Sequence, residues 1–268
     1  MVPSSHTTVG DAQAAEVASP GKVHRPYVSF ESSQVVVVDD FLDEATFRLV
    51  LDYCGRAEYH GVHATGVRKV WRVNDGNPLQ GPTTYWESDQ GSRAADDKRL
   101  YYPAGTEIDL FIEQLLAALP AGERLVGAQG KDWWDFTAAP WIYPAGSALS
   151  LHQDGFDYSG AYTFFAHREW NIHWGGYLLV LDPATPPIDY DSVLGAHASW
   201  IEDGNESKSA MTPGFAQCFF PKPNRLVFIA PDAEHLLSRV DANAGLHPRI
   251  SIAGFFRKRP AETATEAG

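Results

Sequence analysis

The chain has 268 residues, of which 34 are acidic and 21 basic, and its formal net charge is −13. Nucleic acid and anionic membranes would not be attracted to a field of this sign, so we exclude both as partners. Hydrophobic residues make up 44% of the chain and aromatic residues 12%, which is typical of a globular protein and not of a disordered or fibrous one.

The two ends of the chain differ in composition from the rest. Residues 1–26 and 260–268 have no sustained hydrophobic period, which predicts disordered tails around a single domain at residues 27–259. No signal peptide is expected, and no apolar stretch is long enough to span a bilayer. Cys54 and Cys218 are too few and too far apart for a disulfide framework, so we expect a protein of the reducing cytoplasm.

Two helices are predicted in the first half of the domain. A β-branched run at residues 34–38 is typical of a buried strand, and residues 39–43 supply turn and cap chemistry. Apolar residues then recur at helical spacing up to Cys54, and Gly55 is expected to end this helix. The second helix is predicted to begin at a Thr106 cap and to end at residues 120–122.

Residues 60–104 mix aromatic and basic residues with Gly, Pro and Asn, and predict strands with long loops and a candidate lid. From residue 133 onward, short β-prone segments alternate with turn residues, as in a sandwich or jelly roll. Two helices followed by about eight strands predict an α+β, mainly β fold: a double sheet with both helices on one face. The predicted strands are residues 133–143, 148–153, 162–166, 176–181, 215–221, 225–230, 235–240 and 249–257.

The segment that carries chemistry ends in His152-Gln-Asp154. Side chains alternate along a strand, so the imidazole and the carboxylate share one face. His235 opens a later predicted strand and could supply a third ligand. Two imidazoles and one carboxylate leave positions open for a substrate and dioxygen, which favours non-haem Fe(II) over structural zinc. A lone His-x-Asp pair is also expected by chance in a chain with ten histidines.

A candidate anion-binding group follows on the next predicted strand. Arg249 lies fourteen residues after His235, with Ser251 on the same face. A buried arginine needs an anionic partner. The partner could be the far carboxylate of a small dicarboxylate that chelates iron, or an internal salt bridge. Tyr143, nine residues before His152, could reach the same cavity or be a core tyrosine.

Together these motifs resemble the Fe(II)/2-oxoglutarate-dependent oxygenases, specifically their prolyl 4-hydroxylase-like branch. The similarity covers about residues 34–258 and implies a double-stranded β-helix, or jelly roll. The glycines after Trp174 permit close backbone approach before a buried strand. The residues that carry the resemblance are Tyr143-x-x-Gly146-x-x-Leu149-x-x-His152-x-Asp154, Trp174-Gly-Gly-x-Leu178, and His235 followed by Arg249-x-Ser251.

The resemblance implies oxidation of an unactivated C–H bond with release of succinate and CO2. Its cofactors would be Fe(II), 2-oxoglutarate and O2, with ascorbate as a candidate reductant. Related halogenases have Gly or Ala in place of Asp154, so its presence favours hydroxylation. The implied iron ligands are His152, Asp154 and His235, and the residues implied to bind the C5 carboxylate of 2-oxoglutarate are Arg249, Tyr143 and Ser251.

We expect the substrate to be a small molecule, such as an amino acid or a natural-product intermediate, because the chain shows no peptide-recognition module. The alternatives are a peptidyl (prolyl-type) hydroxylase with the same iron site, a non-catalytic metal-binding β-sandwich, and a metallohydrolase. Loops at residues 60–104, 156–174 and 183–213 are expected to cover the substrate. Its candidate contacts are Trp71, Arg72, Asp157, Trp170, His173 and Trp174.

Overall fold

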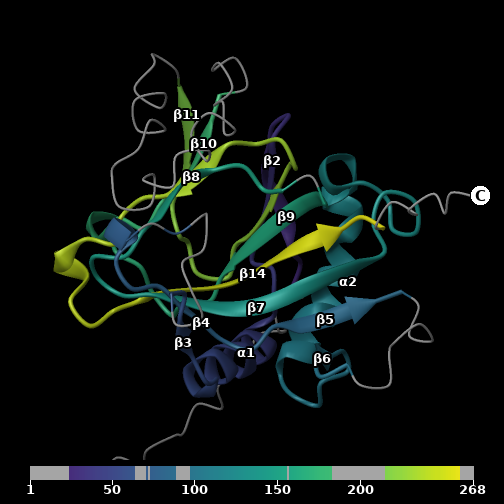
Figure 1. Cartoon of the computed structure of the whole chain (residues 1–268), viewed down its shortest axis with the longest axis horizontal. Coiled ribbons are helices and arrows are strands. Elements are labelled where there is room, and N and C mark those ends of the chain that lie inside the picture. Colours follow the sequence, from purple (N-terminus) through teal and green to yellow (C-terminus); the bar gives the residue numbers. More distant parts are fainter. Residues whose placement is uncertain are drawn as a thin grey trace, which may run out of the picture.

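A computed structural model describes residues 24–63, 71, 73–88, 97–155, 157–182 and 215–259. These residues form two β-sheets and two α-helices, so the expected mainly β architecture is confirmed (Figure 1). Apart from residues 24–26, the expected tails lie outside the described residues. Neither helix is long and apolar enough, within this part of the chain, to cross a membrane.

The larger sheet has ten strands. Eight follow one another in the order β1-β2-β12-β9-β14-β7-β4-β3, and β5 pairs with both β6 and β7. Every pairing except that of β5 with β6 is antiparallel. Its strands are β1 (Tyr27–Glu31), β2 (Val35–Asp39), β3 (His60–Gly61), β4 (Leu79–Gln80), β5 (Thr84–Glu87), β6 (Leu100–Tyr101), β7 (Asp135–Tyr143), β9 (Tyr158–Phe165), β12 (Leu226–Ile229) and β14 (Arg249–Arg257).

The smaller sheet has four antiparallel strands in the order β11-β10-β13-β8. Its strands are β8 (Leu149–His152), β10 (Leu178–Leu181), β11 (Ala216–Phe219) and β13 (His235–Leu237). Each of the eight strands predicted after residue 133 corresponds to one observed strand, from β7 to β14. The short strands β3 to β6 likewise confirm the mixture of strands and loops expected at residues 60–104.

The helices pack against the larger sheet. Helix α1 (Glu44–Arg56) begins at Asp43, whose carboxylate accepts hydrogen bonds from the backbone N–H groups of Ala45 and Thr46. Helix α2 (Ile108–Val126) packs on β2, β9 and β12 and also on α1. Figure 1 shows both helices on the side of the larger sheet and apart from the smaller one. The expectation of two helices on one face is therefore confirmed.

Three predicted helix boundaries are wrong. Gly55 lies inside the last turn of α1, which ends one residue later in an extended Ala57. Thr106 does not cap α2: Glu107 precedes the helix without a side-chain cap bond, and the carboxylate of Asp109 instead accepts from the backbone before it. Local cap chemistry can thus be supplied by a residue inside the helix, which the sequence pattern does not reveal.

Pro120 does not end α2, which continues to Val126. Gly122 is buried where the helix crosses the sheet, and a Cβ there would lie 2.7 Å from the ring of Phe228. The glycine therefore permits a close approach and is not a stop signal. Burial of Leu125 and Val126 holds the last turn in place and outweighs the cost of a proline inside the helix.

Candidate metal centre and adjoining cavity

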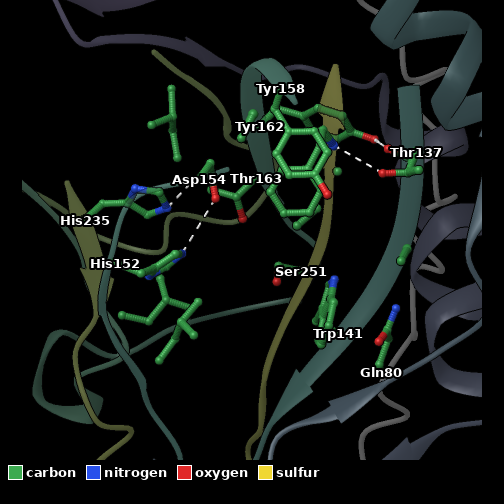
Figure 2. Close-up of a pocket in the computed structure, with 18 of the residues that line it drawn as sticks. Gln80, Thr137, Trp141, His152, Asp154, Tyr158, Tyr162, Thr163, His235 and Ser251 are labelled. Carbon is green, nitrogen blue, oxygen red and sulfur yellow. Dashed lines mark hydrogen bonds and ion pairs between the residues drawn. The ribbon is translucent and has the colours of Figure 1, made fainter. Parts of the chain in front are cut away.

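Two histidines and an aspartate meet between β8 and β13. His152 is the last residue of β8 and His235 the first of β13, and the two face each other in the antiparallel pair. Asp154 follows β8 by two residues, and the ligand atoms of the three side chains lie within 4.8 Å of one another. Figure 2 shows both imidazoles and the carboxylate converging at the wall of a cavity. The structure thus brings the three predicted metal ligands together.

Backbone carbonyls fix the orientation of both imidazoles. The Nδ1 atom of His152 lies 2.8 Å from the carbonyl oxygen of Ser150, and that of His235 lies 2.8 Å from the carbonyl oxygen of Ala233. A carbonyl oxygen only accepts, so each Nδ1 carries the proton and each Nε2 of a neutral ring has a free lone pair. The two Nε2 atoms lie 3.7 and 4.0 Å from the carboxylate oxygens of Asp154. This arrangement is typical of metal-binding histidines.

The charges of the centre fit a divalent cation. Burial, together with the neighbouring His235, lowers the pKa of His152 to about 3, so its ring is neutral at physiological pH. Burial raises the pKa of Asp154, whose side chain is only 5% exposed. Its Oδ2 atom has no hydrogen-bond partner among the described residues. Two imidazoles beside a buried, incompletely satisfied carboxylate form a donor set that a divalent cation would complete.

A guanidinium lies at the start of β14, beside Ser251, which lines the same cavity as the metal centre. Arg249 is 1% exposed; its Nε donates to the carbonyl oxygen of Gly176 at 2.9 Å, and its Nη1 to Ser251 Oγ at 3.2 Å. Its Nη2 is buried without a hydrogen-bond partner, and no described carboxylate forms a salt bridge with it. Burial lowers the pKa of Arg249 to about 10, which leaves it protonated at neutral pH. Within the described chain, the internal salt bridge considered from the sequence is therefore not found.

The two glycines after Trp174 bring the backbone close to this guanidinium. Gly176 has φ +67°, and a Cβ there would lie 3.0 Å from the Cδ of Arg249. Gly175 has φ +66°, and its Cβ would lie 2.3 Å from the carbonyl oxygen of Arg239. Both positions therefore require glycine. The close approach expected from the Gly-Gly pair is confirmed.

Tyr143 lies beside Arg249, its partner in the pairing of β7 with β14. The guanidinium carbon lies 5.3 Å from the centre of the tyrosine ring and 4.9 Å from that of Phe165. Burial raises the pKa of Tyr143 to about 12, so the hydroxyl stays protonated. Tyr143 and Ser251 both line the cavity, so an anion at their side of it could meet neutral hydroxyls and one cation.

The cavity lies between the two sheets and has a volume of about 580 Å³. It runs along β7, β9 and β14 of the larger sheet and reaches β8, β10 and β13 of the smaller one. Aromatic side chains form much of its wall, including Trp71, which stacks on Trp141 at 5.0 Å between ring centres. A cavity of this size suits a small organic molecule bound beside the metal centre.

Among the candidate substrate contacts that the structure describes, only Trp71 lines this cavity. Arg72 lies outside the described residues, as do residues 183–213. Trp170 and Trp174 pack edge to face on each other, and the indole N–H of Trp170 donates to Gly175. Asp157 and His173 are exposed. Proximity to the ligand strand in sequence is therefore a poor guide to which side chains line the cavity.

The sequence reasoning missed most of the cavity wall. Four alternate residues of β7 line it, and four alternate residues of β14 do the same. Alternation along these long strands was the signal that could have identified them, because every second side chain of a strand faces the same side. The residues missed are Thr137, Ala139 and Trp141 on β7, and Ala253, Phe255 and Arg257 on β14, whereas Tyr143 and Ser251 on the same faces were predicted.

No protein-family model matches the sequence, and no curated protein is similar to it. Among solved structures, a Pseudomonas putida prolyl-4-hydroxylase is similar, with 19% identity and a TM-score of 0.50 over 84% of this chain and 93% of that one. A prolyl hydroxylase from Trichoplax adhaerens, in complex with a hypoxia inducible factor peptide fragment, has 13% identity and a TM-score of 0.50 over 85% and 84%. The resemblance to the prolyl 4-hydroxylase-like branch is thus confirmed at the level of fold.

Proposed function

We propose that the protein is an Fe(II)- and 2-oxoglutarate-dependent dioxygenase that hydroxylates, or otherwise oxidises, an unactivated C–H bond of a small molecule. The observation that carries this proposal is the convergence of His152, Asp154 and His235 at one cavity. Tyr143 and Ser251, which contact a buried and partly unsatisfied Arg249, line the same cavity. The similarity in fold to prolyl hydroxylases supports it. We further propose that the two sheets form the double-stranded β-helix of these enzymes.

Iron fits this donor set better than structural zinc. Only three protein ligands converge among the described residues, whereas structural zinc sites are closed by four. The ligands also line a cavity, so coordination positions on that side would be open. His152 and His235 would bind through Nε2, because backbone carbonyls already hold their Nδ1 protons.

Arg249 is the residue proposed to bind the C5 carboxylate of 2-oxoglutarate, with Ser251 and Tyr143 beside it. The free Nη2 offers a charge-assisted hydrogen bond, and burial from water strengthens it. The Ser251 hydroxyl, already in contact with Nη1, can turn its own proton toward the same anion. These three side chains would orient the cosubstrate at one end, while its other end reaches the metal.

The bound iron, with O2 and 2-oxoglutarate, would supply the oxidation of the C–H bond, with succinate and CO2 as coproducts. Burial of all three ligand side chains limits the contact of the metal centre with bulk water. Backbone hydrogen bonds keep both imidazole rings in a fixed orientation, so the centre is preorganised. Ascorbate remains a candidate reductant of the free enzyme's iron.

A small molecule is the proposed substrate, and the cavity supports it. The volume of about 580 Å³ must hold the cosubstrate as well, which leaves space for one compact molecule. Trp71, Tyr85 and Trp141 would give it an aromatic wall. A peptidyl substrate is the second candidate, favoured by the similarity to the Trichoplax adhaerens prolyl hydroxylase that was solved with a peptide fragment.

The test measures succinate formed from 2-oxoglutarate with added Fe(II), while pooled small molecules and proline-containing peptides are screened by mass spectrometry for a gain of one oxygen. We expect succinate release that needs Fe(II) and O2 and that a small molecule stimulates. Full turnover by His152→Ala would refute the iron assignment. Oxygen-independent hydrolysis would favour a metallohydrolase, and metal binding without turnover would favour a non-catalytic β-sandwich.

A further inference from the structure

Strand β8 lies at the edge of the smaller sheet, and residues 75–77 cover its free side. The backbone carbonyl of Asp75 accepts a hydrogen bond from the N–H of Ala148 at 2.8 Å. Its carboxylate accepts from Ser150 twice, from the backbone N–H at 3.1 Å and from Oγ at 2.8 Å. The N–H of Asn77 adds a bond to Ser147 Oγ at 3.2 Å. This short segment therefore satisfies the strand edge in place of another strand.

One residue connects the Asp75 carboxylate to a proposed metal ligand. Ser150, which Asp75 holds by its N–H and hydroxyl, accepts the Nδ1 proton of His152 with its own carbonyl oxygen at 2.8 Å. The hydrogen bond between Nδ1 and the carbonyl sets the angle of the imidazole, so that Nε2 points toward Asp154. A displacement of Ser150 would therefore rotate or withdraw the ligand.

The covering segment is itself fixed in place. The guanidinium of Arg239 donates to the carbonyl oxygens of Asn74, at 2.7 Å, and of Gly146. Gly76 has φ +79°, and a Cβ there would lie 2.7 Å from the carbonyl oxygen of Gly146. The segment therefore packs backbone to backbone on the turn that leads into β8, and Asp75 has a rigid support.

A carboxylate at this position needs an explanation beyond covering a strand edge. Asp75 is only 3% exposed, and burying a charge costs free energy that a neutral amide would not incur. A charged acceptor makes hydrogen bonds roughly twice as strong as a neutral one. Because Asp75 holds Ser150 at both its N–H and its hydroxyl, the carbonyl oxygen of Ser150 stays in place for the Nδ1 proton of His152.

We propose that Asp75 is a positioning residue of the metal centre: through Ser150 it fixes the orientation of His152. The proposal deepens the proposed function, on which it rests, because it requires a metal at His152, Asp154 and His235. No motif of the sequence pointed to Asp75.

The test is a Co(II) titration of the full-length chain, followed by the metal's visible absorption, together with urea unfolding of the metal-free protein. For Asp75→Asn we expect roughly 10- to 100-fold weaker Co(II) binding, the usual effect of losing a partner that orients a ligand. Asp39→Asn is the matched control, since Asp39 is also 3% exposed but pairs with Arg225, away from the site. It should lower stability and leave the Co(II) affinity unchanged.

Equal losses of Co(II) affinity in Asp75→Asn and Asp39→Asn would overturn the proposal. If Asp75→Asn does not fold, Ser150→Ala and Ser150→Thr decide, because only threonine keeps the hydroxyl that donates to Asp75. Weaker Co(II) binding by Ser150→Ala, with the affinity restored in Ser150→Thr, would support the proposal. Equal Co(II) affinities of these two variants would refute it. Failure of the unaltered chain to bind Co(II) would instead refute the metal centre itself, and the positioning role with it.

Discussion

Arg249 carries a positive charge where almost no water reaches it, and one of its donors is unused. If that donor binds the C5 carboxylate, Arg249→Ala removes a charge-assisted interaction of about 1.5–3 kcal/mol. The KM for 2-oxoglutarate should then rise roughly 10- to 100-fold, because each 1.4 kcal/mol is a factor of ten. Steady-state succinate formation at varied 2-oxoglutarate measures it.

Two milder variants serve as controls. Arg249→Lys keeps the charge but loses the forked geometry, so its KM should rise less than that of the alanine variant. Ser251→Ala removes the partner of a single guanidinium nitrogen and should have a smaller effect still. An unchanged KM in Arg249→Ala would exclude the role, whatever the other two variants do.

His167 should make the stability of the protein depend on pH. Burial and the charge of Arg249 lower its pKa to about 4, although the two hydrogen bonds that the protonated ring would donate to the carbonyl oxygens of Pro221 and Ile250 oppose the shift. The unfolded chain therefore binds the proton first as the pH falls. The free energy of unfolding should be highest above about pH 6.5 and should fall as the pH drops toward 4. The total loss should be about 3 kcal/mol, because the pKa of His167 differs by about 2.5 pH units between the folded and unfolded states.

Urea unfolding of the metal-free protein at pH 7, 5.5 and 4 tests this expectation. The unaltered chain should lose more free energy of unfolding over this range than His167→Gln, whose side chain does not titrate. Because other titrating groups are common to both chains, their contributions cancel in the difference. Parallel pH profiles for the two proteins would show that the histidine is not buried as a neutral ring.

Single residues differ in how far the sequence reveals them. His152 and Asp154 were predictable because their spacing places two metal-binding side chains on one side of the chain. Trp170 and Trp174 were predicted near the substrate from proximity in sequence, and they pack on each other instead. Asp75 had no signal at all, because its role depends on a loop that meets the edge of β8 only in the folded chain.

The pairing of β7 with β14 positions Tyr143 on one strand and Arg249 on the other, so the distance between the two strands matters for the site. A Cβ at Gly254 of β14 would lie 1.6 Å from the carbonyl oxygen of Thr137 in β7. Gly254→Ala should therefore push the strands apart and lower the free energy of unfolding by about 1–3 kcal/mol or more. Urea unfolding measures this loss.

Gly55→Ala is the matched control with the opposite sign. Gly55 lies in the last turn of α1, and a Cβ there would meet nothing within 4 Å. Alanine should stabilise this helix by about 0.5–1 kcal/mol, because glycine loses more backbone entropy on folding. A loss of stability in Gly55→Ala would mean that α1 is less helical there than described, and equal effects in both variants would refute the steric argument.

At the scale of elements, buried structure was easier to predict than boundaries. The eight strands after residue 133 were predicted correctly because apolar, β-branched runs between turn residues are a strong local signal. β1 was missed because all five of its residues are exposed and no burial pattern marks it. The end of α2 was missed because the contact of Gly122 with Phe228, which favours continuation past Pro120, is a tertiary contact.

For the whole molecule, the order of secondary-structure elements predicted the fold class. Which strands come together to enclose the cavity could not be predicted. Its wall combines β4 and β5 from the first third of the chain with β14 near its end. Which faces of these strands meet depends on how the sheets twist and pack, not on any local pattern. Consequently the metal ligands could be proposed from the sequence, whereas most substrate contacts could not.

The metal centre joins β8 to β13, so metal binding should stabilise the folded chain as a unit. A ligand that binds only the native state contributes about 2.7 kcal/mol at a concentration 100 times its Kd. For a chain of this size the melting temperature should rise by roughly 5–10 °C with Co(II). Thermal unfolding with and without a chelator measures the shift.

2-Oxoglutarate should raise the melting temperature further only when the metal is bound, because in the proposed binding mode one of its ends contacts the metal and the other contacts Arg249. His152→Ala should therefore lose both shifts, whereas Arg249→Ala should keep the shift from Co(II) and lose that from 2-oxoglutarate. If 2-oxoglutarate stabilises the metal-free protein equally well, the anion site and the metal centre are independent. An unchanged Co(II) shift in His152→Ala would place the metal elsewhere in the chain, because that variant removes one of the three proposed ligands.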